Sequence, residues 1–275
     1  MAKAVLVDTT KCTACRACQV SCKQWNQLPA TTTEFTGSYE NPVDYRGNYT
    51  RITFNETTKD GEPVWHFAKV QCMHCTDAAC IMACPTGALY KSEFGTVALN
   101  AGKCIGCNYC MANCTFGVIY YDRALNRARK CDMCFDRMSN GLTPACVKAC
   151  LTGCLQYGDR DEILTKAHAA VDTAKQRGLV NAQVWGEDLV GGLGWIYVLK
   201  DGPEAYKLPA DPEAPWTARV WSAIFQPVRV VAGLGLLFGL WTNRKNTAEL
   251  APPEPTREGS NADTKPTKST ASAGQ

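Results

Sequence analysis

The chain has few histidines and no strong excess of charge, and both shortages exclude classes of function. Three histidines in 275 residues are too few for a metal array built on imidazole ligands. A formal net charge of +3 is too balanced to indicate a nucleic-acid-binding protein. A Sec-type signal is also missing, because the only apolar run before Lys11 is the short segment Ala4–Val7. We therefore expect thiols that are kept out of disulfides.

Cysteine is the residue present in excess, with 17 copies, an odd number for a disulfide framework. Sixteen of them fall into four groups, numbered here in chain order: Cys12-x2-Cys15-x2-Cys18-x3-Cys22, Cys72-x2-Cys75-x4-Cys80-x3-Cys84, Cys104-x2-Cys107-x2-Cys110-x3-Cys114 and Cys131-x2-Cys134-x11-Cys146-x3-Cys150. Three groups end in Cys-x-x-Gly, and we expect each glycine to adopt a positive φ in a tight turn. The chain thus contains an internal repeat built on thiols.

The spacing in groups one and three is that of bacterial ferredoxins, in which three cysteines hold one cubane and the fourth reaches a neighbouring cluster. Zinc is the main alternative, but zinc sites pair two CxxC motifs over a dozen or more residues, and only group four resembles that. One zinc or [3Fe–4S] exception stays open. The pattern predicts four [4Fe–4S] clusters.

Exchange of the fourth cysteine defines four ligand sets, called quartets here. Groups two and three are natural partners because only 19 residues separate Cys84 from Cys104, and groups one and four pair by elimination. The predicted quartets are the Cys12 quartet (Cys12, Cys15, Cys18, Cys150), the Cys22 quartet (Cys22, Cys131, Cys134, Cys146), the Cys72 quartet (Cys72, Cys75, Cys80, Cys114) and the Cys84 quartet (Cys84, Cys104, Cys107, Cys110).

Residues outside the quartets leave two questions open. Cys154 is either a small buried thiol or a swapped ligand, and we expect it to be dispensable. The basic residues Arg127, Arg129 and Lys130 precede Cys131, where they could raise the reduction potential of a nearby cluster or form a solvated turn.

Alternating and periodic patterns predict the surrounding elements. A strand over 4–8, a hairpin joining 49–54 to 64–70, a helix over 161–177 and a strand over 195–199 are expected. Short helices are expected within 78–84 and 144–150, the second placing Cys146 and Cys150 on one face. The region 26–46 reads as a surface loop.

The segment 217–242 is the candidate membrane helix. Its second half, from Val230 to Trp241, is apolar, and Gly235-x3-Gly239 could pack against another helix. Its first half contains Arg229, which could snorkel or face a partner subunit. We expect a single-pass anchor followed by a disordered tail.

The chain closely resembles the iron–sulfur (beta) subunits of membrane-bound respiratory formate dehydrogenases. The matching stretches are Cys15–Asn26 (CRACQVSCKQWN), Arg129–Cys134 (RKCDMC), Pro144–Lys148 (PACVK), Tyr197–Leu199 (YVL) and Leu208–Glu213 (LPADPE). Iron–sulfur subunits of dimethyl sulfoxide, polysulfide and nitrate reductases share the cysteine pattern, and the C-terminal helix and its approach favour formate dehydrogenase. Cys154 and the short apolar helix depart from the family.

The resemblance implies an electron relay between partner subunits. A catalytic subunit with molybdenum- or tungsten-pterin would supply electrons from formate, and a haem b-type membrane subunit surrounded by lipid would accept them for quinone. It further implies a cluster domain on the periplasmic side of the inner membrane, co-exported with a twin-arginine partner, with the cytoplasmic face as the alternative. No catalytic site, small-molecule substrate or nucleic acid is expected for this chain itself. A free polyferredoxin is the alternative from another class.

The expected architecture is α+β, with two interleaved ferredoxin-like modules that each hold two clusters. The predicted divisions are module A (1–25 and 115–200), an insertion with the hairpin (26–71), module B (72–114), an approach segment (201–216), the transmembrane helix (217–242) and the tail (243–275).

Overall fold

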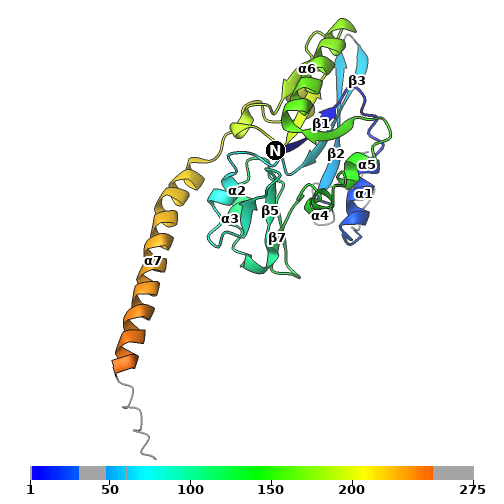
Figure 1. Ribbon diagram of the computed structural model, residues 1–275. Helices are drawn as coiled ribbons and strands as arrows, with labels where there is room; N and C mark the ends of the chain where they lie inside the picture. Colours follow the sequence, from blue (N-terminus) through cyan, green and yellow to red (C-terminus); the bar gives the residue numbers. More distant parts are fainter. Residues whose placement is uncertain (1, 31–47, 60, 250–275) are drawn as a thin grey trace, which may run out of the picture. The chain divides into compact units, whose positions relative to one another are not determined.

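The computed structural model describes residues 2–30, 48–59 and 61–249, shown in Figure 1. The chain divides into two compact units, Met1–Gln226 and Pro227–Gln275, and every cysteine belongs to the first. The strands are β1 (Lys3–Asp8), β2 (Thr50–Lys59), β3 (Glu62–Gln71), β4 (Leu89–Lys91), β5 (Val97–Leu99), β6 (Tyr120–Asp122), β7 (Arg127–Arg129), β8 (Leu155–Asp159), β9 (Gln183–Trp185) and β10 (Trp195–Leu199). The α-helices are α1 (Ala17–Trp25), α2 (Ala79–Met82), α3 (Tyr109–Ala112), α4 (Phe135–Ser139), α5 (Ala145–Lys148), α6 (Arg160–Gln176) and α7 (Trp216–Glu249). Short 3-10 turns are η2 (Ala101–Lys103), η3 (Leu189–Gly191) and η4 (Pro203–Tyr206).

A four-stranded sheet in the order β8-β1-β10-β9 forms the centre of the first unit. β1 pairs antiparallel with β8 and parallel with β10, and both β1 and β10 are almost fully buried. Successive side chains of a strand point to opposite faces, so strands buried on both sides read as continuous apolar runs. On one face Ile163 and Ala167 of α6 pack on Leu6 and Ile196.

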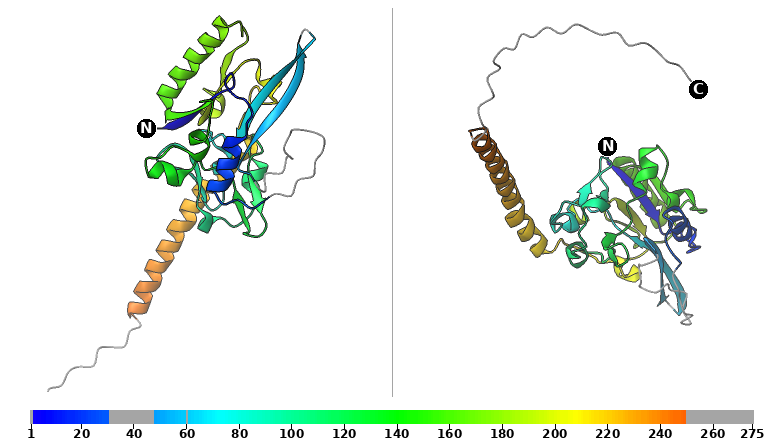
Figure 2. Two further views of the ribbon diagram at one scale, coloured as in Figure 1. Left: turned by 90° about the vertical axis from the view of Figure 1, so that its right-hand side faces the viewer. Right: turned by 90° about the horizontal axis from the view of Figure 1, so that it is seen from below.

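The other face of this sheet carries a long antiparallel hairpin, β2–β3. In the left view of Figure 2, α6 lies on one side of β1 and this hairpin on the other. Ile52 and Ala68 of the hairpin share a core with Val5 and Tyr197 of the sheet and with several cysteines. The predicted hairpin, the strand 195–199 and the helix near 161–177 are confirmed, the hairpin with longer strands than expected.

Two small hairpins, β4–β5 and β6–β7, frame the cysteines of groups two and three. Leu89, Val97 and Ala128 of these strands pack with Cys80 and Cys110 in one apolar cluster. Short helices follow the CxxC loops, since α1, α3 and α4 begin one or two residues after Cys15, Cys107 and Cys134. The first unit therefore contains a large core around the main sheet and a small core around these hairpins.

Helix α7 begins in the first unit and extends into the second. Ala218 is fully buried beside Ala79, and the ring of Trp221 lies 5.3 Å from that of Tyr109. In the second unit the side chains from Leu234 to Trp241 are exposed, and a side chain at Gly235 or Gly239 would meet no other atom.

The expected transmembrane helix is not supported. Among the residues described, none of the helices combines the length and apolar character that crossing a membrane requires. Gln226, Pro227 and Arg229 interrupt the apolar run, which leaves the uninterrupted part shorter than the roughly 20 residues of a span. The side chain of Arg229 lies outside the described part of the structure.

Two other expectations require correction. Helix α5 ends at Lys148, so Cys150 lies beyond it and does not share a helical face with Cys146. Helix α7 continues to Glu249, past the expected start of the tail at 243. The remaining tail residues, 250–275, and positions 31–47 of the expected loop lie outside the described residues.

Candidate metal centres

All four CxxC loops share one backbone feature. The residue before the second cysteine has a positive φ in each: Ala14 (53°), His74 (52°), Gly106 (70°) and Met133 (62°). Side chains other than glycine rarely adopt this conformation, and such strain is found at ligand-holding loops. After the last cysteine of groups two, three and four, Gly87, Gly117 and Gly153 also have positive φ, as expected.

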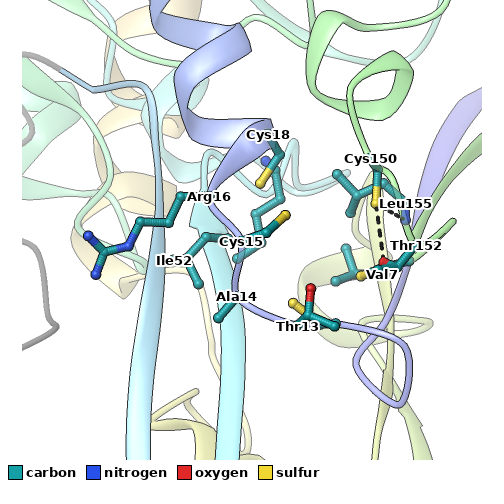
Figure 3. Close-up of a pocket in the computed structure, with 13 residues that line it drawn as sticks. Val7, Thr13, Ala14, Cys15, Arg16, Cys18, Ile52, Cys150, Thr152 and Leu155 are labelled. Atoms are coloured by element: carbon teal, nitrogen blue, oxygen red, sulfur yellow. Dashed lines mark hydrogen bonds between the residues drawn. The ribbon is translucent and has the colours of Figure 1, made fainter.

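The Cys12 quartet surrounds a pocket of about 390 Å³, which includes space open to solvent. Figure 3 shows Cys15 and Cys18 on one side of this pocket and Cys150, from the segment after α5, across from them. Cys12 completes the predicted set, and the fifth thiol in the lining is Cys154. Residues separated by more than 130 positions therefore meet at one site.

The Cys84 quartet lines a similar pocket of about 340 Å³. Cys84 arrives from group two, while Cys104, Cys107 and Cys110 come from group three. Burial raises the pKa of Cys110 to about 12, and the sulfurs of Cys84 and Cys107 raise it as well. This arrangement contains the exchanged fourth cysteine that the ferredoxin spacing predicts.

The two remaining quartets are more deeply buried. Burial raises the pKa of Cys22 to about 12, Lys69 acts in the opposite direction, and the sulfurs of Cys146 and Cys134 raise it further. In the same way burial raises the pKa of Cys75 to about 12, and the charges of Cys72 and Cys114 raise it further. Buried thiols of this kind bind a metal as thiolates, so metal binding releases their protons.

The quartets follow one another in a row through shared apolar clusters. Cys18 and Cys146 lie in one cluster, which joins the Cys12 quartet to the Cys22 quartet. Cys131 and Cys72 lie in a second cluster, which joins the Cys22 quartet to the Cys72 quartet. A third cluster contains Cys80 and Cys110, which joins the Cys72 quartet to the Cys84 quartet.

Hydrogen-bond donors reach several of the sulfurs. The hydroxyls of Thr86 and Thr152 lie 3.7 and 3.8 Å from Cys84 Sγ and Cys150 Sγ. These contacts went unnoticed in the sequence, although the repeated Cys-x-Thr-Gly at both positions is a signal that could have revealed them. Backbone N–H groups of Ala128 and Leu155 donate to Cys104 Sγ and Cys150 Sγ at 3.5 and 3.4 Å. Donors to sulfur stabilise the thiolate form and raise a cluster's potential.

Cys154 lies beside two quartet sulfurs. Its hydrogen bond lowers the pKa of Cys12, and it lowers the pKa of Cys150 to about 5. The same hydrogen bonds, together with burial, raise the pKa of Cys154 itself. The geometry fits a buried S–H donor next to the Cys12 quartet.

The donor sets consist of sulfur alone. His66 and His168 face Asp201 and Glu187, and His74 Nδ1 accepts from Val97 N–H, so the histidines serve other contacts. Over 2–30, 48–59 and 61–249, no three Cys, His, Asp or Glu side chains converge on the position of a single metal ion. Four thiols around a pocket, with N–H and O–H donors to sulfur, fit a [4Fe–4S] cubane. The assignment of individual ligands stays a prediction.

The basic residues before Cys131 have different environments. Arg129 pairs with Asp122 at 3.1 Å and donates to the hydroxyl of Tyr49. Lys130 is 4% exposed, and its ammonium group donates to the carbonyls of Val97 and Cys131. A solvated turn is therefore wrong for Lys130. A second buried cation, Lys69 of β3, was not recognised in the sequence.

Comparisons with known proteins agree with this geometry. Models of 4Fe-4S dicluster domains match residues 11–88 and 63–160. The chain is 38% identical to the nitrate-inducible formate dehydrogenase iron-sulfur subunit of Escherichia coli K12 over 242 residues, 86% of this chain and 82% of that protein. It is 39% identical to the formate dehydrogenase iron-sulfur subunit of Haemophilus influenzae over 239 residues, 85% and 77% of the two proteins. One polypeptide of the anaerobic dimethyl sulfoxide reductase of Escherichia coli K12 is 33% identical over 166 residues, 58% of this chain and 75% of that polypeptide.

Proposed function

Because this chain belongs to the iron–sulfur subunits of formate dehydrogenases, we propose that its sixteen quartet cysteines hold four [4Fe–4S] clusters that form its electron relay. When bound, each cubane accepts and releases one electron. The observation that supports the proposal is that cysteines from different groups line common pockets, Cys150 with group one and Cys84 with group three, while shared apolar clusters link the predicted quartets in a row. The residues of this chain hold, space and insulate the clusters, and the chain supplies no catalytic site of its own.

The two ends of the row are the accessible ones. Cys15 and Cys107 are exposed, whereas Cys22, Cys131, Cys72 and Cys80 of the two inner quartets are buried. Electron exchange with other subunits requires a short distance to their redox groups, so the exposed ends are the natural points of entry and exit. The inner quartets are insulated by apolar side chains of the first unit.

The Cys84 quartet is the end that we assign to a haem b-type membrane subunit. Helix α3, which carries Cys110, contacts the start of α7 through the rings of Tyr109 and Trp221, and Asn113, the residue after α3, accepts a hydrogen bond from the hydroxyl of Thr217. Further along α7, Leu236, Phe238 and Leu240 are 64–69% exposed, and apolar surface of this kind is normally covered by another subunit or by lipid. The Cys12 quartet is then the end that faces a molybdenum- or tungsten-pterin subunit, where formate is oxidised.

We place the cluster-bearing part of the complex on the periplasmic side of the inner membrane. Cubanes are assembled in the cytoplasm, and a threaded chain could not retain them, so the folded subunit would travel with a partner that carries a twin-arginine signal. Protease added to intact spheroplasts should then cleave the cluster-bearing part. Protection in spheroplasts, with cleavage in inverted vesicles, would place it on the cytoplasmic face.

The decisive experiment is purification of the native complex. We expect about sixteen irons per chain, absorbance near 400 nm, bleaching of that absorbance on addition of formate, and a co-purifying pterin protein. Zinc in place of iron, or a colourless protein, would contradict the cluster assignment. Reduction by a substrate of another metallopterin partner, with no response to formate, would instead indicate the dimethyl sulfoxide reductase type.

A further inference from the structure

A buried lysine lies between the first two quartets of the row. Lys69, on strand β3 of the inserted hairpin, is 2% exposed and lines the pocket of the Cys12 quartet. Its electrostatic neighbours also include Cys146 and Cys22, which belong to the Cys22 quartet. One ammonium group is therefore shared by two predicted cluster sites.

The contacts of this ammonium group are all with neutral groups. Lys69 Nζ donates to Gln71 Oε1 at 3.0 Å and lies 4.0 Å from the centre of the Trp195 ring. Gln71 Nε2 donates to Tyr197 Oη, and that hydroxyl donates to the carbonyl of Lys69, which closes a ring of hydrogen bonds. Each of these partners is fully buried, so the position of the ammonium group is fixed.

The missing partner is an anion. Within the described part of the chain no carboxylate lies within ion-pair distance of Lys69, and burying an unpaired cation is costly. Burial alone would lower the pKa of Lys69, but the sulfur charges of Cys146, Cys18 and Cys131 raise it overall. Among the described residues, the sulfurs of the quartet cysteines are therefore the negative charges that face this lysine.

Lys130 shows a different arrangement. It occupies the boundary between the Cys22 and Cys72 quartets, but two backbone carbonyls bind its ammonium group, and Asp132 is a nearby carboxylate. Its charge is therefore partly offset by protein groups. Lys69 has the amide oxygen of Gln71 and the ring of Trp195 but no carboxylate among its described electrostatic neighbours, so the negative charges around it are those of the quartet sulfurs.

We propose that Lys69 is a positioning residue for charge: its fixed ammonium group stabilises the reduced states of the clusters in the Cys12 and Cys22 quartets and raises both reduction potentials. This inference rests on the proposed function, because it requires clusters in those two quartets. Reduction adds one negative charge to a cubane, and a nearby buried cation favours that added charge more than a solvent-exposed one does.

The test compares Lys69→Met with two matched variants in the purified complex. Methionine keeps an unbranched chain of similar length and removes the charge, Lys69→Arg keeps the charge, and Lys175→Met removes an exposed lysine charge from α6. Iron content and 400 nm absorbance of the unaltered protein come first, so a failure of the cluster assignment is recognised separately. Redox titration followed by EPR then gives the potential of each cluster.

We expect Lys69→Met to lower two of the four potentials by at least a tenfold change in the reduction equilibrium constant, about 59 mV for one electron. For the other two clusters, the reduction equilibrium constant should change by less than about threefold. The same limit should hold for all four clusters in Lys69→Arg and in Lys175→Met. Unchanged potentials in Lys69→Met, a uniform shift of all four, or an equal shift in Lys69→Arg would overturn the proposal.

Loss of iron from Lys69→Met is informative as well. Lys69→Gln, which can still donate a hydrogen bond, is then measured in the same way, and the same shift is expected. If both neutral variants lose about eight irons and Lys69→Arg retains them, the charge is required as a counter-ion and the proposal stands. If Lys69→Arg loses iron equally, the role of Lys69 is packing alone and the proposal fails.

Discussion

The Cys12 and Cys84 quartets, at opposite ends of the row, are built on runs of identical spacing, Cys12–Cys22 and Cys104–Cys114. Their loops share two positive φ angles at equivalent positions. The residue before the second cysteine has φ of 53° in Ala14 and 70° in Gly106, and the residue after it has φ of 61° in Arg16 and 63° in Asn108. Spacing therefore determines how three thiols are presented, whatever lies around them.

The surroundings of the two ends are nevertheless different. Lys69, Arg16 and Cys154 line the Cys12 pocket, whereas the described lining of the Cys84 pocket includes no charged side chain. The first pocket adjoins the main sheet and the inserted hairpin, while the second adjoins the small hairpins and helix α3. Equal ligand loops can thus hold clusters of unequal potential, because charge and burial set the potential.

The largest effect, a loss of iron, is expected from variants that test the exchange of the fourth cysteine. Cys22→Ala and Cys114→Ala remove equivalent positions of the two runs, and each should cost about four of sixteen irons, because each sulfur completes the quartet of a neighbouring group. Iron analysis and EPR measure the loss.

Double variants identify the cluster that is lost. Cys22→Ala combined with Cys134→Ala should lose no more iron than either change alone, whereas combination with Cys15→Ala should lose about eight irons. For Cys114→Ala, combination with Cys75→Ala should cause no further loss, because both residues belong to the Cys72 quartet. Combination with Cys107→Ala should cost about eight irons, because Cys107 belongs to the Cys84 quartet. The opposite pattern would mean that each group retains its own fourth cysteine.

The second effect concerns backbone strain in the equivalent loops. A Cβ at Gly106 would lie 2.8 Å from the carbonyl oxygen of Asn126, so Gly106→Ala should destabilise the fold by roughly 1–3 kcal/mol. Ala14→Gly removes the strain of a positive φ but increases the conformational entropy of the unfolded chain. The two effects oppose each other, so the free energy of unfolding should change by no more than about 1 kcal/mol.

Anaerobic bleaching at 400 nm in guanidinium measures this difference as an unfolding rate. Gly106→Ala should bleach several-fold faster than the unaltered protein, and Ala14→Gly at a similar rate to it. Equal rates for both variants would show that the two loops tolerate a side chain equally well.

A smaller effect is expected from Arg16, a half-buried charge at the Cys12 end. The guanidinium of Arg16 lies 4.7 Å from the centre of the Phe54 ring and is only half-buried, so solvent and salt screen it. Arg16→Asn should lower the reduction potential of the cluster in the Cys12 quartet, by less than about a threefold change in its reduction equilibrium constant. Asn108→Arg should raise the potential of the cluster in the Cys84 quartet by a similar amount.

Redox titrations at low and high salt separate this effect from that of Lys69. The shifts at positions 16 and 108 should shrink as ionic strength rises, because both groups contact solvent. A shift as large as that of Lys69→Met, or one that salt does not change, would contradict the distinction between exposed and buried charge.

The smallest effect is expected at Cys154. Cys154→Ala should retain about sixteen irons, because Cys12, Cys15, Cys18 and Cys150 complete the quartet beside it. Iron analysis checks this expectation, and Thr152→Val is a control for loss of a neighbouring donor to sulfur. Loss of about four irons from Cys154→Ala would make Cys154 a ligand and displace Cys150 from the Cys12 quartet.

Much of the fold followed from short-range patterns. The alternation in β2–β3 and the apolar run of β10 predicted strands, and the positions of Gly87, Gly117 and Gly153 predicted turns. The membrane helix was the main error, because the apolar residues of α7 were weighed above the polar residues that interrupt them. Apolar content alone does not distinguish a span from a surface covered by a partner.

The sequence by itself determined the cysteine groups, since the distance between ligands on one short loop is fixed by covalent geometry. Only the tertiary structure decided the charge at each site. Lys69 is held by Trp195 and Tyr197, more than 120 residues away, and nothing near it in the sequence marks it as buried. A ligand loop is a local object, whereas the electric field at a cluster depends on every segment packed against it.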